Sequence, residues 1–527
     1  MPHIIISNFT KQLGNKVLFN NLNLTLQNGV YGIVGSNGSG KSTFLNALNE
    51  VNLGTNTIQL FGMSILFSQL STIPNQNIAQ YLGVDKQLKA FNQIEAGIAN
   101  DTDFELLNEQ WHLPHKVNAL LAELGLPEDP FMSCKNLSGG QLARLKLHLC
   151  FASDADILLL DEPSNHLDSK GKEWLISSIN KFKGLVLIAS HDEQVLNCVD
   201  NILHFNNNSV QSYPMDYQTF KKHFTSEQVS LLAKIDHEKA AQRKLKKVAQ
   251  QSLEKAQQRA AQGKKLRASG SQAKVLLDAK KNAADKTKSR LISMQQHRLS
   301  DAKEKLANLT TQQSSSKSQH FYLNQAEHHK ESTLLTIEDW QCAYLNSSSV
   351  SFTVKQTNRI WLKGPNGSGK STLLKALTDA ESTSPFITFK SGDITYLDQH
   401  YVWLDRFSSS LDALMTISSN LTEQQARSLL AGVGFKGDKV FSNTLSLSGG
   451  EKMKLAMLCV SYAKENALLL LDEPDNHLDI ESKAQLAKAL SAYQGAFILV
   501  SHDNYFVNSL NINMIIDIQV GQTFAVN

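Results

Sequence analysis

The chain has 527 residues, which at roughly 100 to 200 residues per domain indicates two to five domains and excludes a single small fold. Apolar residues make up 41% and charged residues 19%, which excludes a disordered or collagen-like chain. The net charge of +3 at pH 7, taken alone, indicates no polyanionic partner.

The N-terminal residues predict a strand rather than a secretion signal, because no cationic segment precedes Ile4, Ile5 and Ile6. No window reaches the roughly 18 consecutive apolar residues that a membrane span requires, so we expect no membrane partner. The five cysteines are odd in number, scattered and never in a CxxC pair, which is typical of reduced thiols rather than a zinc site. These features predict a cytoplasmic protein.

The first functional motif follows a strand-like run at 30–34 and precedes a helix-like run at 42–49. Glycines in such a loop let backbone N–H groups converge on phosphate oxygens at a helix N-terminus. We expect Lys41 to bridge the β- and γ-phosphates of a nucleotide and Ser42 to ligate Mg²⁺. The residues predicted to bind the nucleotide here are Gly35, Ser36, Asn37, Gly38, Ser39, Gly40, Lys41, Ser42 and Thr43.

Three shorter motifs follow. Leu137-Ser-Gly-Gly-Gln141 could by itself be only a helix cap. The aliphatic run at 157–160 predicts a buried parallel strand that delivers Asp161 and Glu162 at its carboxyl end, where ligands sit in such sheets. Two acids in a surface loop would not explain that run, so we expect Asp161 to hold hydrated Mg²⁺ and Glu162 to orient or deprotonate water. His191, after another apolar run, is expected to sense or stabilise the γ-phosphate.

The centre of the chain is strongly basic. Residues 221–320 hold 23 Lys plus Arg and 8 Asp plus Glu, a net charge of +15, which leaves −12 for the remainder. Residues 224–262 and 272–310 lack Pro and Gly and are rich in good helix formers. With Gly263 and Gly270 at the join, they predict a helical hairpin whose arms reach on the order of 55 to 60 Å and pack as an antiparallel coiled coil.

The tip of this hairpin is basic as well. Lys264, Lys265 and Arg267 are the predicted RNA-binding residues, because a positively charged rod is drawn to a nucleic acid by counterion release. The alternative is a solvated coiled coil that only spaces the flanking domains. An excess of 15 positive charges makes that alternative costly without an anionic partner.

The motifs of the first half return in the second. Leu447-Ser-Gly-Gly-Glu451 follows its counterpart by 310 residues, and Asp472-Glu473 and His502 follow theirs by 311. The phosphate-binding loop returns after 329 residues as Gly364, Pro365, Asn366, Gly367, Ser368, Gly369, Lys370, Ser371 and Thr372. We therefore predict an α/β fold with two tandem P-loop nucleotide-binding domains, at 1–220 and 331–527, joined by the helical hairpin at 221–330.

The offset between the repeats changes along the chain. It is 330 at Gln69 and Gln399 but about 310 from Leu137 onward, so the first domain carries about 20 extra residues. They fall within 75–120, a polar stretch that we expect to form a short arm.

In this order the motifs resemble the nucleotide-binding domain of the ATP-binding cassette superfamily, twice over. In that family two cassettes close head to tail, so that each ATP lies between one P-loop and the opposite signature. The resemblance implies that Lys41 faces the second signature and Lys370 the first. The signature residues are Ser138, Gly139 and Gly140 in the first half and Ser448, Gly449 and Gly450 in the second.

The resemblance also implies the cofactors ATP and Mg²⁺ and two competent sites. Glu162, Glu473, His191 and His502 are the catalytic residues that it implies, and Asp168 and Asp479 match the loop that couples the cassettes. The metal ligands that it implies are Ser42, Gln69, Asp161, Ser371, Gln399 and Asp472.

Three departures from the family pattern concern the signatures and the adenine site. Glu451 and Lys454 stand where Gln141 and Arg144 stand in the first half, so the two closures are expected to differ in strength. The aromatic residue that stacks on adenine in relatives is replaced by Leu13 in the first half. In the second half Trp340 or Tyr344 could serve.

Two cassettes joined by a basic hairpin, with an arm in the first, resemble the F subfamily of these ATPases, as does the Tyr213-Pro-Met-Asp-Tyr217 run. This resemblance implies a monomer that pairs its own cassettes, binds the E site of the ribosome and extends the hairpin toward P-site tRNA and rRNA. It implies translation regulation or antibiotic resistance. The arm either contacts a ribosomal protein or rRNA or is an ordinary surface insertion. A DNA-repair ATPase and a transporter subunit remain alternatives.

Overall fold

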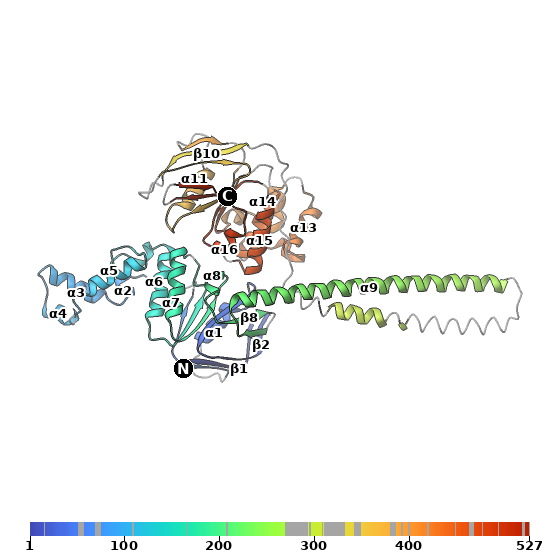
Figure 1. Cartoon of the computed structure of the whole chain (residues 1–527), viewed down its shortest axis with the longest axis horizontal. Helices are drawn as coiled ribbons and strands as arrows, with labels where there is room; N and C mark the ends of the chain where they lie inside the picture. Colours follow the sequence, from blue (N-terminus) through green and yellow to red (C-terminus); the bar gives the residue numbers. More distant parts are fainter. Residues whose placement is uncertain are drawn as a thin grey trace. The chain divides into compact units, whose positions relative to one another are not determined.

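The computed structural model describes most of the chain. The described residues are 1–14, 16–50, 57–68, 75–107, 110–165, 167–206, 209–268, 293–294, 297–307, 309, 332–341, 349–379, 386–390, 394–398, 401–418, 421–447, 449–462, 468–476, 478–493, 495–518 and 522–525. Residues 1–217 and 318–527 form one compact unit, and residues 218–317 form a second, the helical unit. Within the first unit we call residues 1–217 the first cassette and residues 318–527 the second cassette (Figure 1).

The first cassette is built on two sheets. Its six-stranded sheet has the order β5-β6-β7-β3-β8-β9 and is parallel except for β9, while a three-stranded antiparallel sheet has the order β2-β1-β4. The strands are β1 (His3–Leu13), β2 (Lys16–Leu26), β3 (Gly29–Gly35), β4 (Ile58–Phe61), β5 (Ser64–Phe67), β6 (Ile157–Asp161), β7 (Leu185–Ala189), β8 (Asn201–Asn206) and β9 (Ser209–Tyr213). The aliphatic runs of β6 and β7 are fully buried, as expected for central parallel strands covered on both faces.

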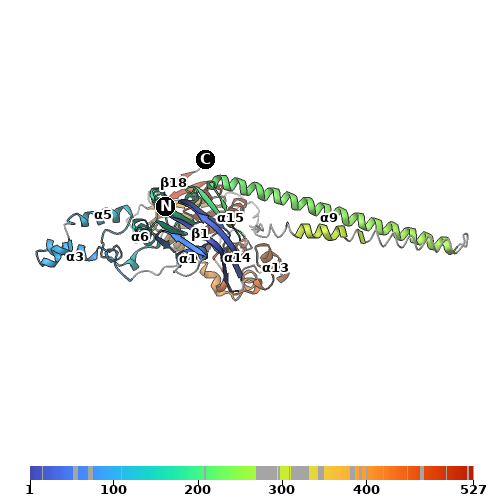
Figure 2. The same cartoon turned by 90° about the horizontal axis from the view of Figure 1, so that it is seen from below.

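The helices of the first cassette include those that carry the predicted insertion. They are α1 (Lys41–Asn49), α2 (Ile78–Tyr81), α3 (Asp85–Glu95), α4 (Asp101–Leu107), α5 (Leu113–Glu123), α6 (Gly139–Ala152), α7 (Ser169–Lys181) and α8 (Glu193–Leu196), with a 3₁₀ turn η1 (Cys134–Asn136). The structure places the extra residues predicted within 75–120 on α2 to α5, between β5 and α6 (Figure 2).

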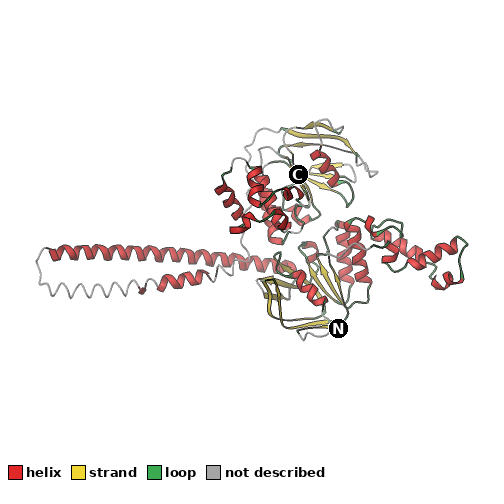
Figure 3. Ribbon diagram, turned by 180° about the vertical axis from the view of Figure 1, so that it is seen from behind, coloured by secondary structure: helices red, strands yellow, loops and turns green. Residues whose placement is uncertain are grey.

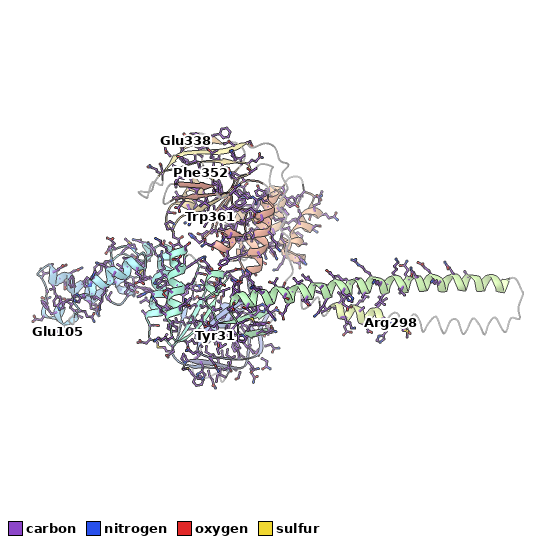
Figure 4. The ribbon with its side chains drawn as sticks, in the orientation of Figure 1. Tyr31, Glu105, Arg298, Glu338, Phe352 and Trp361 are labelled. Atoms are coloured by element: carbon purple, nitrogen blue, oxygen red, sulfur yellow. The ribbon has the colours of Figure 1, made fainter. Side chains whose placement is uncertain are left out.

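The second cassette repeats this topology. Its sheets have the orders β14-β15-β16-β12-β17-β18 and β11-β10-β13, which match the first cassette strand for strand. The strands are β10 (Thr333–Trp340), β11 (Val350–Lys355), β12 (Arg359–Lys363), β13 (Ile387–Lys390), β14 (Ile394–Leu397), β15 (Leu468–Asp472), β16 (Phe497–Val500), β17 (Met514–Asp517) and β18 (Gln522–Ala525). In Figure 4, Tyr31 marks the sheets of the first cassette, and Phe352 and Trp361 mark those of the second.

The helices of the second cassette also follow the first, with a shorter connection before the signature helix. They are α11 (Lys370–Asp379), α12 (Ser410–Ile417), α13 (Glu423–Gly432), α14 (Gly449–Ser461), α15 (Ile480–Ala492) and α16 (Asn504–Asn508), with 3₁₀ turns η3 (Val402–Arg406), η4 (Gly437–Phe441) and η5 (Thr444–Ser446). The α/β fold with two tandem cassettes is therefore confirmed.

The helical unit is dominated by one helix. Helix α9 (Tyr217–Ala268) has 52 residues, on the order of 80 Å at 1.5 Å per residue. Residues 297–307 are also helical and run beside α9 in both views (Figures 1 and 2), and Figure 4 places Arg298 on this segment. Figure 3 shows helix as the secondary structure of the described part of this unit.

The predicted end of the first hairpin arm is wrong. We expected the arm to end at 262, before Gly263, but α9 continues through Gly263 to Ala268. A glycine inside a helix costs only about 1 kcal/mol relative to alanine, which the long flanking run of good helix formers offsets. The backbone of Lys264, Lys265 and Arg267 lies in this last part of α9, whereas Gly270 and most of the second arm lie outside the described residues.

None of the helices in the described ranges combines the length and the apolar character that crossing a bilayer would need.

Candidate functional site

The first phosphate-binding loop joins β3 to α1 and depends on two glycines. Gly38 and Gly40 have φ angles of 73° and 100°, a region that residues with a side chain rarely adopt. A Cβ atom on Gly40 would lie 2.9 Å from Cζ of Phe19. Phe19 packs edge-on against Phe44 and Phe205, so the loop rests directly on a rigid aromatic core.

The second loop, between β12 and α11, has the same construction. Gly367 and Gly369 have φ angles of 78° and 91°. In each cassette the loop lysine turns inward, with Lys41 Nζ 2.8 Å from the Gly35 carbonyl oxygen and Lys370 Nζ 2.8 Å from that of Gly364. Burial lowers the pKa of both lysines, although nearby carboxylates oppose this shift. An ammonium group enclosed by a glycine-rich loop at a helix N-terminus suits a polyphosphate.

Oxygen ligands for a cation gather beside each loop. Asp161 at the end of β6 is hydrogen-bonded to Ser42, and Asp472 at the end of β15 is hydrogen-bonded to Ser371. Burial raises the pKa of both carboxyls, while these hydroxyl groups act in the opposite direction. Hydroxyl and carboxylate oxygens are the ligands that Mg²⁺ prefers, so these pairs fit that ion. Gln69 and Gln399 lie outside the described residues.

The next residue in each cassette is held in an unusual conformation. Glu162 and Glu473 have φ angles of 48° and 50°, although they are not glycines. Such left-handed residues are uncommon and cluster at functional sites. Burial raises the pKa of both carboxyls to about 7. A carboxyl group whose pKa lies near neutral pH is well matched to exchange a proton with water.

A histidine approaches each glutamate. Nε2 of His191 lies 3.5 Å from Oε1 of Glu162, and Nε2 of His502 lies 3.6 Å from Oε1 of Glu473. Burial and nearby lysines lower the pKa of both histidines, to about 3 for His502. Both rings are therefore neutral at physiological pH. The structure thus brings the four predicted catalytic residues together as two equivalent pairs.

The signature motifs lie at helix starts. Ser138 caps α6, with Gln141 N donating to Ser138 Oγ over 3.3 Å and Ser138 N donating to Gln141 Oε1 over 3.0 Å. Gly139 and Gly140 form the first turn of α6, and Gly449 and Gly450 form the first turn of α14. Ser448 lies outside the described residues. Both Ser138 and the second-half motif are therefore at the kind of helix terminus that attracts anions.

The two cassettes meet at the first phosphate-binding loop. The backbone N–H of Asn37 donates to Oδ2 of Asp479 over 3.2 Å, and Oδ1 of Asp479 caps α15. A Cβ atom on Gly450 would lie 3.8 Å from Nδ2 of Asn37. Its counterpart Asp168 caps α7 and lies 3.9 Å from Arg144. The signature and coupling loop of the second cassette thus face the phosphate loop of the first.

The structure describes two of the places where the sequence departs from the family pattern, namely the signature motif and the adenine-stacking position. Glu451 pairs with Lys439 at 3.0 Å, whereas Gln141 is used to cap its own helix. Trp340 is 5% exposed and belongs to the core of the second cassette, which disfavours it as an adenine-stacking residue. Leu13 is exposed in the first cassette, and Tyr344 lies outside the described residues.

Sequence reasoning missed two lysines at the same interface. Lys172 in α7 and Lys483 in α15 line a small polar cavity of about 30 Å³ together with residues of both cassettes. Their separation of 311 residues equals that of the Asp-Glu and histidine motifs, and this signal could have identified them. The cavity also contains Asp475, where the first cassette has Ser164.

Known proteins resemble this chain over almost its full length. The sequence profile described as ABC transporter matches residues 19–165 and 347–476, together more than half of the chain. The probable ATP-binding protein YheS of Escherichia coli K12 is 28% identical over 528 residues, covering 96% of this chain and 77% of that protein. The probable ATP-binding cassette sub-family F member 3 homolog of Encephalitozoon cuniculi is 30% identical, covering 96% and 78%.

A solved structure has the same tandem arrangement. It is described as the complex of archaeal ribosomal stalk protein aP1 and archaeal ribosome recycling factor aABCE1, and it aligns with a TM-score of 0.53 at 15% identity, covering 97% of this chain and 87% of that chain. At this level of identity the likeness shows the fold alone. From the paired phosphate loops, the repeated Asp-Glu and histidine motifs and these relatives, the chain belongs to the ATP-binding cassette family and, within it, to the F subfamily.

Proposed function

We propose that this protein is an Mg²⁺-dependent ATPase whose two cassettes close on ATP into two composite sites. The hydrogen bond from Asn37 to Asp479 and the approach of Gly450 to Asn37 support the first composite site. In that site Lys41 faces Ser448, Gly449 and Gly450 across one ATP. In the second, Lys370 faces Ser138, Gly139 and Gly140 across the other.

The chemistry of each site follows from its residues. The loop backbone and lysine bind the phosphates, and bound Mg²⁺ would neutralise developing charge on the phosphate oxygens. Glu162 and Glu473 orient the attacking water and accept its proton. His191 and His502, neutral and next to these glutamates, hold them in place and contact the γ-phosphate.

The proposed target of this ATPase is the ribosome. In its ATP-closed form the protein binds the E site, and the hairpin extends toward P-site tRNA and rRNA through Lys264, Lys265 and Arg267. The observation that carries this proposal is the helical unit itself. Residues 218–317 separate from the cassettes as a compact unit and carry 23 basic and 8 acidic residues, a net charge of +15 that suits a polyanion.

The consequence of ribosome binding is either regulation of translation or protection from an antibiotic. We propose domain limits of 1–220, 221–330 and 331–527, with the arm within 75–120 as a second contact to the ribosome. Deleting 262–272 and measuring both translation rate and drug susceptibility in a host separates the two outcomes. A change in drug susceptibility alone supports resistance.

The test uses a protein that binds ATP without hydrolysing it. Replacing both glutamates, Glu162→Gln with Glu473→Gln, removes the proton acceptors but leaves the phosphate loops intact. We expect ATP hydrolysis to fall by about 10² to 10⁴-fold, in line with the usual contribution of a general base. In ATP the double variant should sediment with ribosomes far more than the wild type does.

A matched control is Glu173→Gln with Glu338→Gln, which changes two exposed glutamates by the same chemistry. It should hydrolyse ATP and leave ribosomes as the wild type does. If the double variant stays out of the ribosome fraction with and without ATP, ribosome binding is wrong. Recovery with DNA, or with membranes, would instead support the DNA-repair or transporter alternative.

A further inference from the structure

One buried lysine and one largely buried lysine at the cassette interface have no role in the motifs described above. Lys172 lies in the first turn of α7 and Lys483 in the first turn of α15. Their side chains are 6% and 16% exposed. Lysine is almost never buried unless its charge is paired, so each position requires an explanation.

Each lysine pairs first with an aspartate of its own cassette. Lys172 Nζ lies 2.6 Å from Oδ2 of Asp192, and Lys483 Nζ lies 2.8 Å from Oδ2 of Asp503. The other oxygen of each aspartate caps the following short helix, through the backbone N–H of residues 194 and 505. The aspartates are therefore held in one orientation by their own helices as well as by the lysines.

Each lysine then reaches into the opposite cassette. Lys172 Nζ donates to the carbonyl oxygen of His502 over 2.9 Å, and Lys483 Nζ donates to the carbonyl oxygen of His191 over 3.2 Å. The two bonds are reciprocal and relate equivalent residues. Each histidine whose backbone is held in this way has its ring beside the glutamate of its own cassette.

The aspartates around Lys483 explain why its charged side chain is stable at the interface. Burial by itself lowers the pKa of Lys483, but Asp503, Asp475 and Asp192 outweigh burial and raise it overall, so the ammonium group stays charged. A buried ion pair is favourable only when further hydrogen bonds satisfy its remaining donors. The histidine carbonyl of the other cassette supplies such a bond, and it is available only while the cassettes are in contact.

We propose that Lys172 and Lys483 are reciprocal positioning residues, each holding the histidine of the opposite cassette beside its glutamate. Closure of the interface is then coupled directly to the geometry of both hydrolytic pairs. The inference rests on the proposed two-site ATPase. A purely structural ion pair would affect only the cassette that contains the lysine. A positioning lysine instead affects the rate of hydrolysis at the glutamate of the opposite cassette.

The experiment measures the first turnover of bound ATP in proteins with one working glutamate. Glu162→Gln leaves only the pair of Glu473 and His502, and there Lys172→Met should slow the first turnover roughly tenfold, within the usual range of coupling between sites. Glu473→Gln leaves only the pair of Glu162 and His191, and there Lys172→Met should have little effect. Lys483→Met should give the opposite pattern.

ATP binding provides a second readout. Neither lysine belongs to a phosphate-binding loop, so the Kd of ATP should change only through the lost closure contact and by a smaller factor than the rate. Lys170→Met and Lys488→Met are matched controls, because these exposed lysines lie on the same two helices. They should alter neither quantity.

A second variant, in which the partner aspartate is also neutralised, separates a loss of positioning from a loss of folding. Lys172→Met alone leaves Asp192 buried and unpaired, whereas adding Asp192→Asn removes that charge and keeps an acceptor for the helix cap. The double variant should regain the wild-type Tm and still show the crossed loss of rate. Equal loss in both backgrounds, or loss confined to the lysine's own cassette, would overturn the inference. If the single glutamate variants hydrolyse like the wild type, the proposed function fails instead.

Discussion

Asp475 is a carboxyl group at the interface that has no acidic counterpart in the first cassette, where Ser164 occupies the equivalent position. It is 3% exposed, and Oδ1 makes no hydrogen bond within the described part of the chain. Burial raises its pKa to about 6, and Asp503 adds to this shift, whereas Lys483, a hydrogen bond from Ser501 and Lys172 lower it. The charged form is therefore less stable in the folded protein than in the unfolded chain.

This imbalance predicts a pH-dependent effect of Asp475→Asn. The cost of ionising Asp475 is absent below its ordinary pKa of 3.8 and develops fully as the pH rises through about 6. At pH 8 the substitution should therefore stabilise the protein by up to about 3 kcal/mol, from roughly 1.4 kcal/mol per pKa unit. At pH 5 the gain should be smaller.

Thermal unfolding at the two pH values measures this difference. The control is Asp438→Asn, which changes an exposed aspartate of the same cassette. A gain that is the same at both pH values, or a loss at pH 8, would contradict the assignment of a raised pKa to Asp475.

Sequence analysis identified the functional residues that belong to local motifs and missed the features that depend on tertiary contacts. Lys41, Asp161 and Glu162 belong to motifs whose chemistry is local, and the repeat gives their counterparts. The left-handed backbone of Glu162 could not be predicted, because tertiary contacts rather than side-chain preference impose it. The bond from Lys172 to His502 joins residues 330 positions apart, so no local pattern reveals it.

At the scale of the elements, α9 shows how propensity and composition combine. Its sequence is rich in Ala, Lys and Gln, and a single glycine at 263 does not interrupt it. The predicted turn at Gly263 failed because one weak helix former cannot end a cooperative helix when strong formers lie on both sides. The backbone of residues 264–268 thus continues the same helix.

This arrangement predicts that the end of α9 contributes directly to RNA binding. Changing Lys264, Lys265 and Arg267 to Glu should weaken binding to ribosomes. It should also reduce the dependence of log K on log salt by about three, since each lost phosphate contact removes roughly one unit of slope. Ribosome binding in ATP, measured across a salt series, gives both quantities.

The same change in charge can be made away from the helical unit. Lys170, Lys181 and Lys183 are exposed residues of the first cassette, and replacing them with Glu should leave the slope nearly unchanged. An equal reduction in both triple variants would show that net charge, rather than the end of α9, governs binding.

At the scale of the whole molecule, the two proposed ATP sites share one interface. Bonds from Asn37 to Asp479, from Lys172 to His502 and from Lys483 to His191 all cross it. If both proposed sites bind ATP, we expect a change at either site to alter contacts on which the other depends, which is the physical basis of coupling between sites.

Coupling predicts that neither cassette works at its normal rate alone. Lys41→Met or Lys370→Met should each reduce steady-state ATP hydrolysis to well under half of the wild-type rate, because one missing phosphate contact weakens closure at both sites. Lys181→Met, on the surface of the first cassette, should leave the rate unchanged. Independent sites would instead leave about half of the rate in each loop variant.

Ser164 and Asp475 occupy equivalent positions in the two cassettes but differ in charge. This difference limits which assemblies of cassettes can form such an interface. A homodimer of identical single-cassette chains would place the same residue on both sides and thus bring two aspartates or none. If Lys172, Lys483, Asp192 and Asp503 are counted at their formal charges, two aspartates give a net charge of −2 and none gives 0. This chain, with Asp475 alone, gives −1. Two different cassettes in one chain can therefore adopt this intermediate, asymmetric state, which a homodimer cannot.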